Sequence, residues 1–510
     1  MARILWADDE IELLKPHVMF LESKGHQVTT VQSGNEAVDQ VKDENYEIIF
    51  LDENMPGLTG LETLEHIKAQ KPSIPIIMIT KSEEESIMDS AIGGRINDYL
   101  IKPVNPNQIL LSIKKNLEGK RLVNEQTTLN YQQKFREISM DLQDSLDFDG
   151  WIDIYKRLVY WEVQFDKSDQ SMMEVLQMQK NEANQLFSKY VCNNYLDWFN
   201  GDGPIMSHQL INKKVLPSIT GKKTFLLVID NLRYDQWQSI RPILMERYRP
   251  KEESLYYSIL PTATQYARNA LFAGMMPSEI QKTFPSKWKN EDDEGSKNKF
   301  EEDFLNNNLK SNGYNNKTSY NKITNLDAGK KLVTNFSNLL QNELNVIVYN
   351  FVDMLSHART DMEVIRELAD DESAYRSLTI SWFEHSPLYD IIKLIADNNC
   401  DLIITTDHGT IKVDDPSKVV GDRNTNSNLR YKQGKNLNYQ DKDVLAIKNP
   451  EAAFLPRLNV SSTYLFAKES KFFVYPNNYN YYVNYFKNTF QHGGISMEEM
   501  IIPYVHLESK

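Results

Sequence analysis

The chain has 510 residues, 41% of them hydrophobic and 25% charged, and this globular composition excludes disorder for most of its length. With 57 basic and 71 acidic residues, the net charge of −14 argues against a protein that coats DNA. Two cysteines cannot form a disulfide framework or a cysteine-rich zinc module. We find no signal segment and no apolar run long enough for a bilayer, so we expect a cytoplasmic protein without membrane contact.

Short apolar strands alternate with amphipathic helices over the first hundred residues. The segments expected as buried strands are 3–7, 27–31, 47–52, 75–80 and 97–103. Alternating strands and helices predict an α/β fold with a doubly wound parallel sheet, whose functional groups gather at the carboxyl ends of the strands. We place this domain at residues 1–118.

Five side chains that suit phosphoryl transfer lie at the ends of these strands. Asp8 and Asp9 follow the first strand, Asp52 ends the third, Thr80 ends the fourth, and Lys102 follows the fifth. Converging carboxylates repel one another unless a hard cation such as Mg²⁺ neutralises them. A carboxylate beside Mg²⁺ can attack phosphorus, while the lysine and threonine face the phosphoryl oxygens. Solvated helix caps explain a single acidic residue of this kind, but not the whole set.

This set resembles the receiver domain of two-component response regulators. The matching segments are DDE at 8–10, LDENMPGLTG at 51–60, IT at 79–80 and YLIKP at 99–103. The resemblance implies that a histidine kinase phosphorylates Asp52, that Thr80, Tyr99 and Lys102 form the switch, and that the Lys102–Pro103 bond is cis. The Mg²⁺ ligands that it implies are Asp8, Asp9, Asp52 and the carbonyl of Asn54.

The middle of the chain, residues 119–214, has a different texture. It contains no proline between Pro106 and Pro204, and apolar and aromatic residues recur at helical spacing around Trp151. This pattern predicts an all-α helical bundle that links two domains. We interpret it as a spacer without chemistry.

Buried strands return in the third domain, residues 215–510, at 224–230, 345–353 and 401–409. A polar stretch at 287–325 is interpreted as a surface insertion. Acidic and imidazole side chains follow these strands and precede the C-terminal one. They are Asp230, Asp353, His357, Asp407, His408 and His492.

Such oxygen and imidazole ligands suit Zn²⁺ or Mn²⁺. Because they come from four places in the chain, two neighbouring ions are the natural arrangement, and two ions about 3.5–4 Å apart clamp the attacking and leaving oxygens of a phosphoryl transfer. A nucleophile is offered by Thr262 or Thr264, which precede a helix-like run. Each threonine taken alone is equally well explained as a helix cap.

The ordered set resembles the PglZ domain of the alkaline phosphatase superfamily. The resemblance implies one zinc ion on Asp353, His357 and His492, and a second on Asp230, Asp407, His408 and the nucleophile. The second threonine matches the PT-x-T pattern of related phosphodiesterases, so Thr264 is preferred over Thr262. The additional charged residues of true alkaline phosphatases have no counterpart here, which favours phosphodiesters over monoesters.

Receiver, helical linker and PglZ domain in this order resemble PorX-type response regulators. The resemblance implies an enzymatic output on nucleotide or oligonucleotide phosphodiesters, a link to type IX secretion and a sigma factor partner. A zinc-dependent phosphodiesterase is the first hypothesis. The alternative is a signalling scaffold whose metal site is structural and which binds a sigma factor. A regulator that binds DNA itself is disfavoured by the charge and by the absence of a helix-turn-helix pattern.

Arginines near the catalytic segments are candidates for substrate binding. Arg233 and Arg268 lie three and four residues past Asp230 and Thr264, and arginine holds phosphate bidentately. The basic stretch 421–436 suits either a phosphodiester backbone, with Tyr431 stacked on a base, or a solvated surface loop. Phosphorylation at Asp52 is expected to repack the surface near Ile92, Arg95 and Tyr99 and to favour a homodimer.

Overall fold

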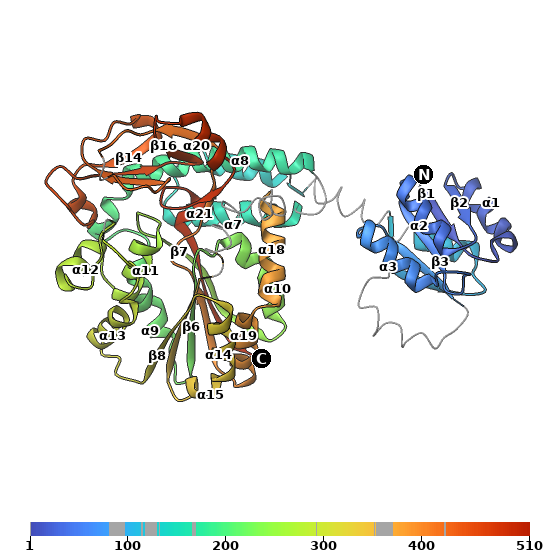
Figure 1. Ribbon diagram of the computed structural model, residues 1–510, viewed down its shortest axis with the longest axis horizontal. Coiled ribbons are helices and arrows are strands. Elements are labelled where there is room, and N and C mark those ends of the chain that lie inside the picture. Colours follow the sequence, from blue (N-terminus) through green and yellow to red (C-terminus); the bar gives the residue numbers. More distant parts are fainter. Residues whose placement is uncertain are drawn as a thin grey trace. The chain divides into compact units, whose positions relative to one another are not determined.

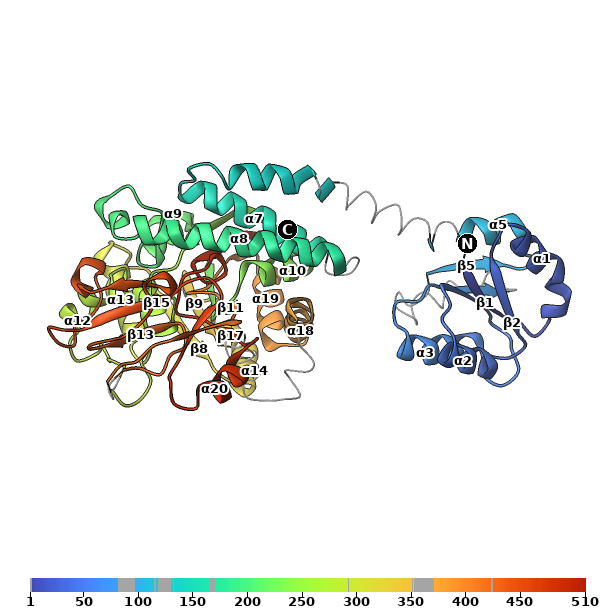
Figure 2. The same cartoon turned by 90° about the horizontal axis from the view of Figure 1, so that it is seen from above.

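The computed structural model describes residues 2–80, 97–113, 116–117, 130–131, 133–165, 170–291, 293–350, 352, 371–422 and 425–510. The chain forms two compact units, Met1–Lys134 and Phe135–Lys510, shown in Figures 1 and 2. Among the described helices, none combines the length and the apolar character that crossing a membrane requires.

A five-stranded parallel sheet forms the N-terminal unit, in the order β2–β1–β3–β4–β5. Its strands are β1 (Arg3–Ala7), β2 (Gln27–Val31), β3 (Ile48–Asp52), β4 (Ile76–Thr80) and β5 (Asp98–Ile101). The helices described in this unit are α1 (Lys15–Ser23), α2 (Gly34–Asp43), α3 (Gly60–Gln70) and α5 (Pro106–Ile113). This confirms the predicted doubly wound fold.

The two faces of this sheet belong to separate hydrophobic cores. Leu5 and Ala7 of β1 join Val38 and Leu64 from α2 and α3, whereas the alternate residue Trp6 joins the core on the side of α5. Side chains alternate across a strand, so strands buried on both faces read as continuous apolar runs. That is why the sequence displayed these strands clearly.

A six-stranded sheet is the centre of the second unit, in the order β7–β18–β10–β6–β9–β8. Strands β6 (Thr224–Ile229), β8 (Thr318–Ile323), β9 (Leu344–Tyr349) and β10 (Asp401–Thr405) are parallel. The C-terminal strand β18 (Ile501–Ser509) runs antiparallel to β10 and to β7 (Tyr248–Tyr257). The helices that follow β6 and β7 are α10 (Tyr234–Met245), α11 (Thr264–Ala273) and α12 (Pro277–Thr283).

Between β7 and β10, the chain also forms helices α13 (Glu301–Ser311), α14 (Leu326–Thr334), α15 (Phe336–Leu339), α18 (Glu372–Glu384) and α19 (Pro387–Asp397). The polar stretch 287–325 is therefore not a surface insertion, because it supplies α13 and the edge strand β8. Phe304, Leu305 and Leu309 of α13 are buried. Their helical spacing was the signal for this element, and the many asparagines and lysines around them masked it.

Smaller sheets lie above the main sheet in Figure 1. One joins β13 (Tyr431–Gly434), β15 (Thr463–Ala467) and β14 (Val444–Ile447). Two pairs join β12 (Asp415–Lys418) with β16 (Lys471–Val474), and β11 (Ile411–Lys412) with β17 (Phe490–Gln491). Helices α20 (Tyr479–Phe486) and α21 (Met497–Met500) precede β17 and β18 respectively.

The described part of the linker forms helices α7 (Phe148–Phe165) and α8 (Gln170–Asn194), which lie along one side of the second unit in Figure 2. The hydroxyl of Tyr257 in β7 donates to the Phe148 carbonyl at 2.9 Å, and the hydroxyl of Tyr195 accepts from the Leu260 amide at 2.8 Å. The linker helices and the six-stranded sheet therefore pack as one body.

Candidate functional sites

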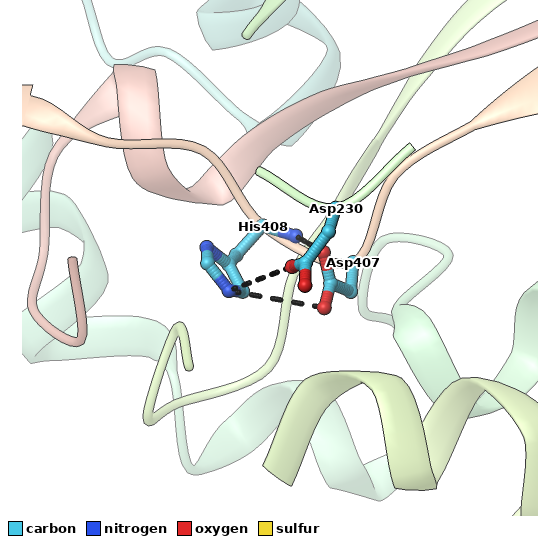
Figure 3. A group of neighbouring side chains, drawn as sticks. All are labelled: Asp230, Asp407 and His408. Atoms are coloured by element: carbon cyan, nitrogen blue, oxygen red, sulfur yellow. Dashed lines mark hydrogen bonds and ion pairs between the residues drawn. The ribbon is translucent and has the colours of Figure 1, made fainter. Parts of the chain in front are cut away.

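Three candidate metal ligands meet at the carboxyl ends of β6 and β10. These strands are parallel neighbours, so Asp230 after β6 and Asp407 and His408 after β10 emerge side by side. Each offers a ligand atom within 4.8 Å of the others. Figure 3 shows the three side chains turned towards one another. All three residues are fully buried.

The orientation of His408 is set by its own loop. Its Nδ1 lies 3.1 Å from the Gly409 carbonyl oxygen, which leaves Nε2 towards the carboxylates. That Nε2 is 3.9 Å from Asp230 Oδ1 and 3.8 Å from Asp407 Oδ2. The His408 amide donates to Asp407 Oδ1 at 3.0 Å, so the loop bends at these adjacent residues. Both side chains can therefore point towards the same metal site. Carbonyl contacts of this kind commonly fix the ring of a metal-binding histidine.

Burial and the negative charge of the two carboxylates make their ionised state unfavourable at this site. Burial raises the pKa of Asp230 to about 6, with Asp407 adding to the rise and Arg268 opposing it. The Arg268 guanidinium lies 2.6 Å from Asp230 Oδ2 and 3.8 Å from Asp407 Oδ2, and its side chain is 1% exposed. Two buried carboxylates with one counter-cation retain an excess of negative charge, which a divalent cation would offset.

The two threonines have different surroundings. Thr264 is the first residue of α11, and its Oγ1 lies 3.0 Å from His408 Nε2 and 3.4 Å from Asp230 Oδ1. It is half-buried, unlike the ligands beside it. Thr262 is fully buried, and its hydroxyl donates to the Gly494 carbonyl at 2.8 Å and accepts from the Gly493 amide at 3.1 Å. Thr262 therefore holds the loop that carries His492.

His492 lies against the same cluster. Its ring stacks on that of His408, with centroids 4.3 Å apart, and its Nδ1 lies 3.2 Å from the Thr262 carbonyl oxygen. The other two residues of its predicted zinc set, Asp353 and His357, lie outside the described residues.

Both candidate substrate arginines are buried in ion pairs. Arg233 lies 2.7 Å from Glu372 and also binds Asp235, with 1% of its side chain exposed. The predicted phosphate contact of Arg233 is therefore replaced by contacts with carboxylates in the interior. Arg268 binds Asp230 and Glu301 from behind the metal ligands, so it acts as their counter-charge.

Arg430 and Tyr431 of the basic stretch 421–436 lie in the interior, whereas Lys435 is exposed and residues 423–424 lie outside the described residues. Arg430 is fully buried and lies 2.6 Å from Glu499, and the buried Tyr431 donates its hydroxyl hydrogen bond to Glu291. A Cβ on Gly493 would lie 2.5 Å from the Tyr431 ring, and one on Gly494 would lie 2.8 Å from an Arg430 nitrogen. These two side chains therefore support the loop of His492, rather than a nucleic acid or solvent.

Sequence reasoning missed two residues that position the site. Glu301 of α13 binds the guanidinium of Arg268 and accepts from the hydroxyl of Tyr320 at 2.6 Å. Asn298 donates to the Thr264 carbonyl at 3.0 Å. Both belong to the stretch interpreted as an insertion. The helical period of α13 could have indicated the burial of Glu301, whereas Asn298 precedes this helix and had no such signal.

The receiver carboxylates also converge. Asp8, Asp9 and Asp52 offer ligand atoms within 4.8 Å of one another, and Lys102 Nζ lies 2.9 Å from Asp8 and 2.8 Å from Asp52. Burial raises the pKa of Asp52, an effect that the Lys102 hydrogen bond reduces and the Asp8 charge reinforces. Burial opposes the charge of Lys102, but its bonds to Asp52 and Asp8 raise its pKa overall.

The other receiver residues lie around this cluster. Thr80 is buried at the end of β4, Asn54 is exposed in the loop after β3, and the Lys102–Pro103 bond is cis as expected. Tyr99 is 59% exposed on β5. The switch partners Ile92 and Arg95 lie outside the described residues.

Three family models match successive parts of the chain. The response regulator receiver domain matches residues 4–114, the PorX response regulator linker domain 121–199, and the BREX system PglZ alkaline phosphatase-like domain 210–507. Fold and sites thus define a response regulator whose output domain is alkaline phosphatase-like. The chain belongs to the PglZ alkaline phosphatase-like family and has the PorX-type architecture of receiver, linker and PglZ domain.

Individual relatives resemble about a quarter of the chain. It is 33% identical over 112 residues to the transcriptional regulatory protein ResD of Bacillus subtilis, covering 22% of this chain and 46% of ResD. It is 33% identical over 123 residues to PilH of Pseudomonas aeruginosa, covering 23% of this chain and 100% of PilH. The chain spans about half the length of the first curated relatives that it matches.

A solved structure with similarity is that of the response regulator TrrA from Thermotoga maritima in complex with Mg²⁺ and BeF. The sequence identity is 30%, the TM-score is 0.22, and the match covers 23% of this chain and 100% of TrrA.

Proposed function

We propose that this protein is a two-component response regulator whose PglZ domain is a zinc-dependent phosphodiesterase. The observation that carries the proposal is the position of Thr264. Its hydroxyl lies at the half-buried edge of a buried ligand set, 3.0 Å from His408 and 3.4 Å from Asp230. A capping threonine has no need of this environment, whereas a nucleophile does.

The donor set fits zinc. Two carboxylates and an imidazole within 4.8 Å match the oxygen and nitrogen ligands that Zn²⁺ prefers, and the excess negative charge suits a divalent ion. Asp230, Asp407, His408 and Thr264 would hold one ion, and Asp353, His357 and His492 a second. When bound, the metal supplies positive charge that lowers the pKa of the Thr264 hydroxyl and stabilises a phosphoryl oxygen.

The protein's own groups then prepare the substitution at phosphorus. Asn298 and the first turn of α11 hold Thr264 in place, and the positive end of this helix favours a negatively charged oxygen. Attack by Thr264 Oγ on a diester forms a threonine–phosphorus bond and breaks the bond from phosphorus to one ester oxygen, and that fragment leaves as an alcohol that takes up the proton lost by the threonine. Water then attacks phosphorus, the bond to Thr264 Oγ breaks, and the second fragment leaves as a phosphate monoester while the threonine hydroxyl is restored. The buried ligands exclude water behind the nucleophile, so substrate approaches from the half-buried side.

The substrate class proposed is a nucleotide or oligonucleotide phosphodiester. It is supported by the PorX-type architecture and by the lack of an assigned binding group for a second anionic oxygen of a monoester. Arg268 does not fill that role among the described residues, because carboxylates occupy its guanidinium.

The receiver supplies the control. We infer that a cognate histidine kinase phosphorylates Asp52 with Mg²⁺ on Asp8, Asp9, Asp52 and the Asn54 carbonyl, and that Lys102 neutralises the incoming phosphoryl group. Thr80 and Tyr99 would relay the change. Homodimer formation on phosphorylation, a sigma factor partner and a role in type IX secretion are part of the same proposal and rest on the PorX-type architecture.

The test is metal analysis of the purified protein together with hydrolysis of bis(4-nitrophenyl) phosphate. We expect two zinc ions per chain and turnover that Thr264→Ala abolishes and Thr264→Ser partly retains, with zinc still bound in both variants. Thr262→Ser serves as the matched control for a threonine that holds structure. Zinc without turnover on any ester would support the scaffold alternative instead.

A further inference from the structure

Helix α8 of the linker holds the short helix behind the histidine ligands. Asn184 donates to Glu498 Oε2 at 2.9 Å and accepts from the Met497 amide at 2.9 Å, so one buried amide fixes the start of α21. Helix α21 packs directly against Gly409, since a Cβ there would lie 2.0 Å from the Glu498 carbonyl oxygen. Gly409 follows His408, and the loop before α21 carries His492. Asn184 therefore contacts α21, which in turn contacts the segment of His408 and follows the loop of His492.

Helix α7 reaches the remaining ligand segment through ion pairs. Glu162 lies 2.7 Å from Lys180 of α8 and 2.7 Å from Arg376 of α18, and all three side chains are buried. Arg376 also lies 3.0 Å from Asp235 in the first turn of α10. The linker carboxylate is thus connected to α10 through one arginine.

The first turn of α10 begins four residues after Asp230, and ion pairs hold it to α18. Arg233 binds Asp235 through two nitrogens, with Nε 2.8 Å from Oδ1, and it lies 2.7 Å from Glu372 of α18. Arg233 is the residue at the N-terminus of α10, three residues after Asp230. Between strand and helix, Asn231 has a φ of 65°, the left-handed conformation, and its amide donates to Asp407 Oδ1 at 3.3 Å, so this short turn is held at both ends.

The charges of this network depend on one another. Buried carboxylates raise the pKa of Arg233 against the effect of burial, and Arg233 and Arg376 lower the pKa of Asp235 against the same effect. Removing the Glu162 charge leaves Arg376 with Asp235 and Lys180 with Glu498 at 3.5 Å, so each buried cation loses one of its counter-charges and the neighbouring pairs must rearrange. A change at Glu162 is therefore expected to reach the Asp230 turn.

We propose that Glu162 and Asn184 of the linker are positioning residues for the metal site of the PglZ domain. The linker is then not a spacer, as its sequence suggested, but part of the support of all three described ligand segments. This inference rests on the proposed function in that the site holds a metal. Since the linker follows the receiver in the chain, this support is also where receiver control would enter.

The test compares Glu162→Gln and Asn184→Ala with two controls on the same helices. Asp153→Asn changes an exposed carboxylate of α7 that pairs with Arg157, and Asn181→Ala removes an exposed amide one turn from Asn184. Binding of Co²⁺ to metal-free protein is followed by visible absorption, at a temperature where circular dichroism shows each variant folded. We expect the dissociation constant to rise at least tenfold in both test variants and to stay within twofold in the controls.

Amide hydrogen exchange of the metal-free proteins gives a second readout. We expect faster exchange in the peptides around 228–236 for Glu162→Gln and around 404–410 for Asn184→Ala, without change in β13 or β15. Unchanged Co²⁺ affinity and unchanged exchange in these peptides, even with a lower melting temperature, would overturn the proposal. If the wild type binds no Co²⁺, the proposed function fails, while the exchange comparison still decides the positioning role. Glu162→Gln tests the contacts that lead to α10, and Asn184→Ala tests those that lead to α21. If one variant fails to fold, the other still tests the proposal.

Discussion

The chain contains two clusters of strand-end carboxylates, and they differ in how they are shielded. In the receiver, Asp9 is exposed and the counter-charge is Lys102, whose side chain is 12% exposed. In the PglZ domain, Asp230 and Asp407 are fully buried and Arg268 is 1% exposed. A site that gains and loses Mg²⁺ and a phosphoryl group needs access from solvent, whereas a resident zinc site benefits from burial. The same strand-end geometry thus suits a reversible switch in one unit and a permanent centre in the other.

The largest expected effect concerns covalent labelling of the accessible cluster. Asp52→Ala should lose all labelling by acetyl phosphate, because Asp52 is the proposed phospho-acceptor, with Lys102 at 2.8 Å and Asp8 and Asp9 beside it for Mg²⁺. Phosphate incorporation is measured by intact mass after quenching, with Asp39→Ala as an exposed control. Label at the wild-type level in Asp52→Ala would remove the receiver assignment.

Metal content separates the two halves of the buried centre. His408→Ala and His357→Ala should each lose about one of two zinc equivalents, because the lost imidazole is replaced poorly by water. Plasma emission analysis after dialysis measures this, and His385→Ala, an exposed histidine, should keep both ions. If both ligand variants keep two zinc ions, the division of ligands between the ions is wrong.

The free energy of unfolding should fall by different amounts when the two counter-cations, Arg268 and Lys102, are each removed. In metal-free protein, Arg268→Met leaves Asp230 buried without its ion-pair partner and Glu301 with Lys322 alone, and it should cost about 3–5 kcal/mol of unfolding free energy. Lys102→Met should cost less, because Lys102 is 12% exposed and the exposed Asp9 opens this cluster to solvent, even though Asp8 and Asp52 are buried. Urea unfolding followed by fluorescence and circular dichroism measures both. Equal losses would contradict the difference in shielding.

Two lysines differ in whether a carboxylate compensates their burial, and their pKa values shift in opposite directions. Lys102 has carboxylate partners and a raised pKa, whereas burial lowers the pKa of Lys432 to about 7 beside the Asn426 carbonyl. Between pH 10.5 and 7 the unfolded chain binds a proton at Lys432 that the fold does not, so stability falls as the pH falls through this range. Lys432→Met should remove that slope from the melting temperature. An unchanged slope between pH 7 and 10 would show that Lys432 is charged in the fold.

Local signals account for what the sequence predicted. Strands β1 and β2 have the predicted bounds, because short segments between helical patterns mark strands. β1 is buried as expected, whereas the edge strand β2 is mostly exposed or half-buried, so the prediction of a buried strand there is wrong. The residues after β6 and β10 were identified because chemistry at strand ends leaves acidic and imidazole groups next to such runs. The parallel pairing of these strands then brought Asp230, Asp407 and His408 together.

Contacts between residues far apart in the sequence explain what could not be predicted from it. Asn184 and Glu498 are 314 residues apart, and neither carries a local sign of the other. Arg430 and Tyr431 looked like a substrate-binding surface because composition does not reveal burial. Strand β7 lies at the sheet edge beside β18, and its charged YRPKEES segment hid the strand pattern. In each case the decisive contact joins segments that only the folded chain brings together.

The central claim is that Thr264 attacks phosphorus. Its most direct test is rapid quenching of the zinc-loaded protein during turnover of a dinucleotide phosphodiester, followed by mass spectrometry of the peptide that contains residues 260–268. The account predicts a substrate-derived phosphoryl ester on Thr264 that is absent from Thr264→Ala, with no adduct on Thr262. An adduct on another residue, or wild-type turnover in Thr264→Ala, would contradict it.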